Sequence, residues 1–146
     1  MSTRRPAFPH VPRARLDPLV RLTDVLAIVE LAVARPLQHE TLAIFTDSQR
    51  RGCGVSVVSG TTSADAVFDV AASLAMVAQE IDEIDGVVLV SVRPGEGVAA
   101  GDIERWNELR LLVADHGLEL IDWIVLGRHG PEMPRAVLGA ADPWES

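Results

Sequence analysis

A loop that follows a buried, apolar stretch is the part of this sequence best suited to carry chemistry. Residues 87–92 form a nearly continuous apolar run, followed by Arg93-Pro94-Gly95 and then by Asp102 at the start of a helical pattern. Such a run predicts a strand buried on both faces of a sheet. Because α/β domains place binding and catalytic groups in loops at the carboxyl ends of such strands, Ser91, Arg93 and Asp102 are the first candidate site residues.

The other residues with reactive side chains give weaker signals. Cys53 is the sole cysteine, which excludes an intramolecular disulfide and a multi-cysteine zinc site. Arg50 and Arg51 would favour its thiolate, but no histidine or aspartate partner follows from the sequence, so we interpret Cys53 as a half-buried structural thiol. The histidines have no metal-ligand spacing, and we expect them to be solvated: His10, His39, His116 and His129.

Hydrophobic periodicity predicts alternating helices and strands around the loop. The predicted elements are a helix, a hairpin, a helix, a strand, a helix and a strand, over residues 17–35, 40–46 with 54–59, 63–81, 87–92, 102–116 and 118–126. Asp17-Pro18 is the expected start of the first helix. This order predicts a single α/β domain in which a mixed sheet is flanked by helices on both sides.

Length and composition agree with one globular domain. The chain has 146 residues, 48% hydrophobic and 23% charged, the balance of an ordinary globular protein. Residues 1–16 are basic and proline-rich without an apolar period, so we expect a flexible arm. Residues 128–146 are rich in glycine and proline and predict an irregular tail, with one short edge strand at 135–138.

Charge and hydropathy exclude several classes of partner. The net charge is −8, and the first fifteen residues carry four arginines and no acid, so the folded body is more acidic than the whole chain. An acidic surface repels phosphate backbones, and we therefore expect no nucleic-acid partner. No apolar run reaches the roughly 20 residues that span a bilayer, and no secretory signal pattern is present. The expected location is the cytoplasm, without a membrane partner.

Four sequence blocks around the candidate loop resemble one known family. In chain order they are His39-Glu40-Thr41-Leu42-Ala43-Ile44-Phe45-Thr46-Asp47, Val58-Ser59-Gly60-Thr61, Val88-Leu89-Val90-Ser91-Val92-Arg93-Pro94-Gly95 with Gly101-Asp102-Ile103, and Gly117-Leu118-Glu119-Leu120-Ile121-Asp122-Trp123-Ile124-Val125-Leu126-Gly127. Together they resemble the C-terminal domain of RadC-type proteins, which has the JAB/MPN metalloprotease-like fold. The resemblance implies a RadC-like domain over residues 17–127 with a three-layer, cytidine-deaminase-like architecture.

The resemblance also implies a metal site that this chain has lost. Active family members bind zinc with a His-x-His-Pro motif and an aspartate that opens the next helix, while a glutamate on the first strand is the general base. On this chain the two histidine positions fall at Ser91 and Arg93, the aspartate at Asp102 and the glutamate at Glu40. Serine is a poor zinc ligand and arginine cannot coordinate a cation. We therefore expect no metal and no cofactor at this vestigial site.

Arg93 would supply a cation where the metal once lay. Two buried carboxylates without a countercharge must either protonate or remain ionised at a high cost in free energy. We therefore hypothesise that Arg93 forms an ion-paired fork between Glu40 and Asp102. The alternative is that Arg93 is an exposed loop residue.

These departures predict a catalytically inactive domain with a degenerate JAMM motif. It would act as an interaction or scaffold module, with a protein partner or a second copy of itself. Two alternatives stay open. One is a zinc-dependent hydrolase or isopeptidase of the JAMM type with a non-standard ligand set, such as Glu40, Asp102 and a histidine from elsewhere. The other is a module that binds a small molecule or peptide in the vacated pocket.

Overall fold

The computed structural model describes residues 11–145, which form a five-stranded mixed sheet with four helices packed against it. The elements are α1 (Leu22–Ala32), β1 (Glu40–Thr46), β2 (Gly52–Ser59), α2 (Ala66–Ala78), β3 (Gly86–Val92), α3 (Asp102–Asp115), β4 (Glu119–Gly127), β5 (Gly130–Glu132) and α4 (Pro134–Val137). The strand order is β2-β1-β3-β4-β5, with only β3 and β4 parallel. The expected α/β class, mixed sheet and antiparallel hairpin are confirmed.

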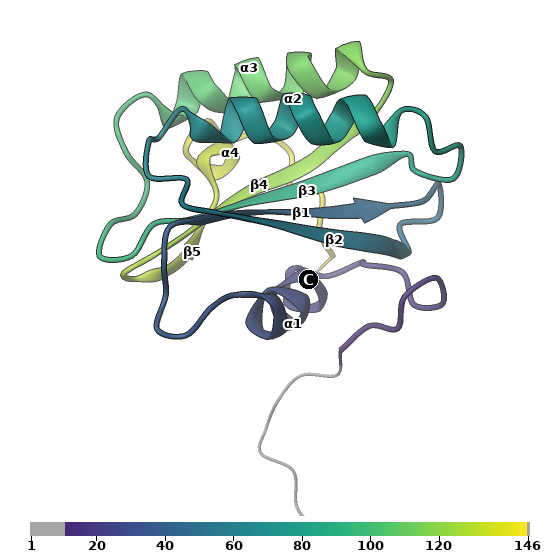
Figure 1. The fold of residues 1–146 in the computed structure, drawn as a ribbon, viewed down its shortest axis with the longest axis horizontal. Coiled ribbons are helices and arrows are strands. Elements are labelled where there is room, and N and C mark those ends of the chain that lie inside the picture. The colour runs from purple at the N-terminus through teal and green to yellow at the C-terminus, as the bar shows by residue number, and fades with distance from the viewer. Residues whose placement is uncertain (1–10, 146) are drawn as a thin grey trace, which may run out of the picture.

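Strand alternation gives the sheet two buried faces, each with its own core. In β1, Leu42 and Ile44 belong to one apolar cluster, whereas Ala43 and Phe45 belong to the other, because successive side chains of a strand point to opposite faces. The first cluster is completed by α1 and the second by α2 and α3. Figure 1 shows the resulting three layers, with α2 and α3 on one face of the sheet and α1 on the other.

The central strands fix the position of the candidate loop. All seven residues of β1 and all seven of β3 are buried, which confirms residues 87–92 as part of a central strand. Because β3 and β4 are parallel, α3 must carry the chain from the end of β3 back to the end of the sheet at which both strands begin. The loop of residues 93–101 therefore lies at the carboxyl ends of β3 and β4, directly before the first turn of α3.

The first helix begins later than its sequence predicts. α1 starts at Leu22, and the carboxylate of Asp24 accepts hydrogen bonds from the backbone N–H groups of Val20 and Arg21 at 3.0 and 2.9 Å. The predicted start at Asp17-Pro18 is wrong, because Pro18 instead forms an isolated bridge with Arg51 beside the hairpin. A tertiary contact thus overrides a local start signal. Residues 1–10 of the predicted basic arm lie outside the described part of the chain.

The second helix is shorter than predicted. α2 ends at Ala78, so Ile81 lies beyond it and is 42% exposed. The helical spacing of the apolar residues from Val67 to Ile81 predicts one inward stripe, and Val67, Ala71 and Ala78 on it are buried, but Val77 is 62% exposed. The apolar stripe is therefore narrower than its sequence pattern indicates.

The segment after β4 packs against the domain. Residues 135–138, predicted as a short edge strand, lie in or directly after the short helix α4, which begins with Pro134. Proline suits the first position of a helix because its missing N–H needs no partner there. Further on, Trp144 joins the apolar cluster on the α1 face of the sheet. The expectation of an irregular tail is therefore wrong for β5, α4 and Trp144.

A buried polar cluster fastens this segment to the sheet. The carboxylate of Asp122 on β4 is fully buried and accepts a hydrogen bond from Trp144 Nε1 at 2.8 Å and one from the Trp123 backbone N–H at 2.9 Å. Arg135 of α4 is also buried, and its Nε lies 3.1 Å from Asp122 Oδ1. Trp144 and Arg135, both distant from Asp122 in the sequence, thus contact its buried carboxylate.

Candidate functional site

The candidate loop is tightly connected to the end of β4. The backbone N–H of Arg93 donates to the carbonyl oxygen of Leu126 at 2.9 Å, and the N–H of Glu96 donates to the carbonyl of Arg93 at 3.0 Å, closing a turn. Gly95 has a φ of +74°, which favours glycine. A side chain at Gly127 would overlap the backbone of Glu96. The turn is therefore held directly against β4, and it fixes the direction in which Arg93 extends.

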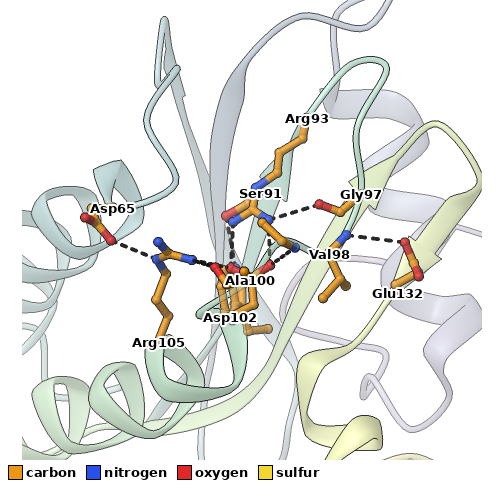
Figure 2. A network of polar contacts seen from close by, with 11 residues as sticks. Asp65, Ser91, Arg93, Gly97, Val98, Ala100, Asp102, Arg105 and Glu132 are labelled. Carbon is orange, nitrogen blue, oxygen red and sulfur yellow. Dashed lines mark hydrogen bonds and ion pairs between the residues drawn. The ribbon is translucent and has the colours of Figure 1, made fainter.

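Arg93 forms a two-pronged ion pair with Asp102. Its Nη1 donates to Oδ2 at 2.7 Å and its Nη2 donates to Oδ1 at 3.1 Å. Nη1 also donates to the carbonyl of Gly97 at 3.1 Å. The exposed fraction of Arg93 is 7% and that of Asp102 is 0%. Figure 2 shows the two side chains meeting beneath the loop. The alternative of an exposed Arg93 is excluded.

The Asp102 carboxylate accepts hydrogen bonds from three residues. Beside Arg93, the backbone N–H of Ala99 donates to Oδ2 at 2.6 Å and Arg105 Nη1 donates to Oδ1 at 2.9 Å. Burial alone would raise the pKa of Asp102, but the hydrogen bonds and positive charge of Arg93 and the bonds from Ala99 and Arg105 outweigh it, so the pKa lies below its usual value. Asp102 is therefore ionised at neutral pH.

The ion pair extends outward through a residue that the sequence analysis did not single out. Arg105 lies one turn after Asp102 on α3, and its Nε donates to Asp65 Oδ1 at 2.8 Å. Figure 2 shows this chain of contacts from Asp65 through Arg105 and Asp102 to Arg93. The three-residue spacing of Asp102 and Arg105 is a signal that could have identified Arg105, because such residues are neighbours on a helix. Asp65 is forty residues away in sequence and gives no such signal.

Ser91 lies close to Arg93 but serves a different partner. Its exposed fraction is 6%, and its hydroxyl oxygen accepts a hydrogen bond from Trp123 Nε1 at 3.0 Å. The guanidinium carbon of Arg93 lies 5.7 Å from the centre of the Trp123 ring, within the range of a cation–π contact. Trp123 is fully buried and belongs to the apolar core on the α2 and α3 face. Indole, hydroxyl and guanidinium groups thus pack as one unit.

Glu40 does not pair with Arg93, and that part of the hypothesis is wrong. Glu40 alternates with Thr41 and shares the side of Leu42, on the α1 face, whereas Arg93 and Asp102 meet on the α2 and α3 face. Its Oε2 accepts a hydrogen bond from the backbone N–H of Ala34, just after α1, at 3.2 Å. The Glu40 carboxylate thus engages the chain just after α1, and the hypothesised fork is reduced to Arg93 and Asp102.

A small polar recess lies beside the ion pair. Its volume is about 40 Å³, and the residues around it include Thr41, Thr61, Ser91, Arg93 and Glu96. The hydroxyls of Thr41 and Thr61 bond each other at 2.9 Å. Since a single water needs roughly 10–15 Å³ of such space, the recess has room for a few waters.

The arrangement of side chains is suited to holding structure. Each oxygen of Asp102 accepts at least two hydrogen bonds, and the Ser91 hydroxyl is engaged by an indole. Neither group is therefore free to act as a base or nucleophile without breaking these bonds. Within residues 11–145, no group of three or more His, Cys, Asp or Glu side chains is arranged to hold a metal ion.

Among the other reactive side chains, His39 lies near the loop, with its Nε2 3.5 Å from Glu96 Oε1. Cys53 is partly buried on β2, and burial raises the pKa of its thiol, with Asp47 and Glu83 adding to the effect. This disfavours the thiolate that Arg50 and Arg51 would promote. Among the histidines, His116 lies at the end of α3, where its Nδ1 is 3.0 Å from the carbonyl oxygen of Leu112.

Comparison with known proteins adds no assignment to this geometry. The sequence matches no protein-family model, and it matches no curated protein. Within the described residues, no helix combines the length and the apolar character that crossing a membrane requires.

Proposed function

We propose that this chain is a non-catalytic domain of the RadC-like JAB/MPN type that acts through protein–protein contacts. The proposal combines the resemblance of four sequence blocks with the three-layer arrangement of the helices and the sheet. It rests most heavily on one observation, which is the paired Arg93 and Asp102.

The ion pair lies where the resemblance would put the catalytic metal. Asp102 opens α3 and would be the carboxylate ligand, and Arg93 stands at the second histidine position of the motif. The guanidinium satisfies both carboxylate oxygens and brings the positive charge that a metal would otherwise bring. An arginine at this position prevents zinc binding for two reasons. Its guanidinium has no lone pair to donate to a metal, and its hydrogen bonds engage both oxygens of the Asp102 carboxylate.

The two alternatives find less support in the same geometry. A zinc hydrolase with a non-standard ligand set would need Glu40 and Asp102 as free ligands, but Glu40 accepts a hydrogen bond from the Ala34 backbone N–H and Asp102 is paired with Arg93. A small-molecule module would need a pocket of roughly 300 Å³ or more, whereas the recess beside Arg93 measures about 40 Å³. A contact function needs neither a metal nor a cavity.

Metal analysis of the wild-type protein tests the non-catalytic assignment. The full chain is purified without chelator, dialysed against a zinc-containing buffer and then against metal-free buffer, and its zinc content is measured by mass spectrometry. We expect well below one zinc per chain. One zinc per chain that is lost on Asp102→Asn would overturn the proposal, because it would show that Asp102 binds metal in the presence of Arg93.

A designed zinc site tests the family assignment itself. The Ser91→His/Arg93→His double variant would restore both imidazoles beside Asp102, so we expect it to bind zinc in a calorimetric titration. The Arg93→His single variant is the matched control and should bind far more weakly, because it has one imidazole fewer. A folded double variant, judged by circular dichroism, that binds zinc no better than wild type would refute the alignment of Ser91 and Arg93 with the motif.

A further inference from the structure

Within residues 11–145, the outer edge of the sheet at β2 has no partner over most of its length. β2 ends the strand order, and β1 is its only strand neighbour among these residues. Its backbone hydrogen bonds outside β1 are confined to its start, where Arg15 N–H donates to the carbonyl of Gly52 at 2.9 Å. From Cys53 to Ser59, a row of outward N–H and C=O groups is therefore available to another strand.

Residues 11–14 border the groove beside Gly52 to Val55, but within residues 11–145 the rest of this edge lacks the devices that keep such strands apart. Natural proteins protect exposed edges with charged residues, prolines, very short strands or covering segments. β2 has eight residues, and the whole stretch of residues 52–64 contains no charged residue and no proline. A single bulge, between the partners of Phe45 and Thr46, lies at its start. An edge of this kind is suited to pairing with another strand.

Apolar side chains flank the free backbone groups. Val55 and Val57 are 45% and 42% exposed on the α1 face, and Val58 is 36% exposed on the other face. Leu31 of α1 is 73% exposed, and it lines an apolar groove of about 380 Å³ together with Val55. Figure 1 shows β2 at the margin of the sheet, with α1 below it. A strand added here would cover apolar surface as well as backbone.

A second copy of this chain suits this edge as the occupant. The net charge of −8 opposes contacts between charged faces of two copies. Because residues 52–64 carry no charge, two β2 strands can pair without placing like charges opposite each other. Antiparallel pairing of identical strands is also self-complementary about a twofold axis, the commonest symmetry of oligomers.

We propose that β2 is a homodimer interface, in which β2 of two copies pair antiparallel and join the two sheets into one. This inference names a partner for the proposed contact function and rests on it. The interface is separate from the Arg93 cluster, so the zinc experiments do not test it.

Light scattering after size exclusion measures the predicted assembly. The full-length wild-type chain should have twice the mass of one chain over a dilution series. Val57→Lys adds a charge to the edge in each copy, and we expect the dimer dissociation constant to rise by at least about tenfold, or 1.4 kcal/mol. Val137→Lys is the matched control, because Val137 is 65% exposed on α4, away from β2, and it should dimerise like wild type.

Hydrogen exchange locates the interface independently of any variant. Amides of residues 53–59 should exchange more slowly at high than at low protein concentration, while those of α4 should not change. A wild-type monomer, a Val57→Lys variant as dimeric as wild type, or exchange in residues 53–59 that ignores concentration would overturn the proposal. So would a wild-type monomer that dimerises only after deletion of residues 1–10, which would make that segment the occupant. A monomer without zinc would overturn the dimer alone and leave the non-catalytic assignment intact.

Discussion

Replacing Arg93 with methionine should destabilise the protein far more than replacing an exposed, ion-paired arginine. Methionine keeps much of the length of the side chain but removes the charge, so the buried Asp102 loses its two bonds at 2.7 and 3.1 Å. The bond to Gly97 and the contact with the Trp123 ring are lost as well. The variant thus leaves a buried carboxylate with fewer partners, which is the costly way to break an ion pair.

The expected loss of stability in Arg93→Met depends on the hydrogen bonds that Asp102 retains. Removing one partner of a buried pair typically costs about 3–5 kcal/mol. Asp102 still accepts bonds from Ala99 and Arg105, which places the expected loss near the lower limit, at about 3 kcal/mol. Arg35→Met is the matched control, because its ion pair with Glu30 has side chains that are 53% and 64% exposed. Such surface pairs contribute about 0–1 kcal/mol.

Urea unfolding followed by tryptophan fluorescence and circular dichroism measures both variants. If both variants have the same slope of unfolding free energy against urea concentration, their losses of stability can be compared directly. A cycle of Arg93→Met, Asp102→Asn and the double variant should give a coupling energy of about 1–3 kcal/mol. If Arg93→Met lost no more stability than Arg35→Met, or if the cycle showed no coupling, the interpretation of the pair as a buried structural centre would be wrong.

Three further predictions concern the buried contacts of Asp102, Asp122 and Gly127. Because the pKa of Asp102 is lowered on folding, its ionised form stabilises the protein fully above the unfolded pKa of about 3.9 and loses that effect as the pH falls through the folded pKa; the stability gap between wild type and Asp102→Asn in urea should therefore shrink below about pH 4, and a constant gap would contradict this. Trp144→Phe removes a donor from buried Asp122 and should cost about 1–3 kcal/mol, whereas Trp106→Phe should cost less, since Trp106 Nε1 has no partner among residues 11–145; equal losses in thermal unfolding would be the contrary result. Gly127→Ala would force the Glu96 backbone away and should cost about 1–3 kcal/mol, while Gly54→Ala, whose added carbon meets nothing within 4 Å, should be nearly neutral by the same measurement.

Hydrophobic patterns in the sequence predicted the strands and helices well where a strand is buried on both faces or where apolar residues recur at clear helical spacing. The apolar run in β3 has no alternation because the strand is covered on both faces, and it was correctly identified as central. In α3, helical spacing predicts an inward face that carries Ile103, Trp106, Leu109 or the stem of Arg110, and Val113; Trp106, Leu109 and Val113 are buried, whereas Ile103 is half-buried. Errors arose at the ends of helices, where non-local contacts decide, as Pro18 shows by bridging to Arg51.

The candidate site could be predicted only in part, for a physical reason. Arg93 and Asp102 were paired by an argument about charge, and a separation of nine positions, spanned by a loop, can close such a contact. The side of the sheet that Glu40 takes was not predictable, because every residue of β1 is buried and the strand shows no polar alternation. Asp122, Arg135 and Trp144 meet across the fold, and no periodic pattern encodes such a contact.

The position of β1 between two very different partners has a consequence for the order of assembly. Its pairing with β2 closes a short hairpin, whereas its pairing with β3 joins residues that are 40 (Thr46 and Gly86) to 52 (Glu40 and Val92) positions apart, with α2 in between. Loop-closure entropy makes the hairpin the earlier contact and the β1–β3 ladder the later one. β1 thus links a local, fast-forming half of the sheet to a slower, non-local half, and the β1–β3 ladder should limit the folding rate.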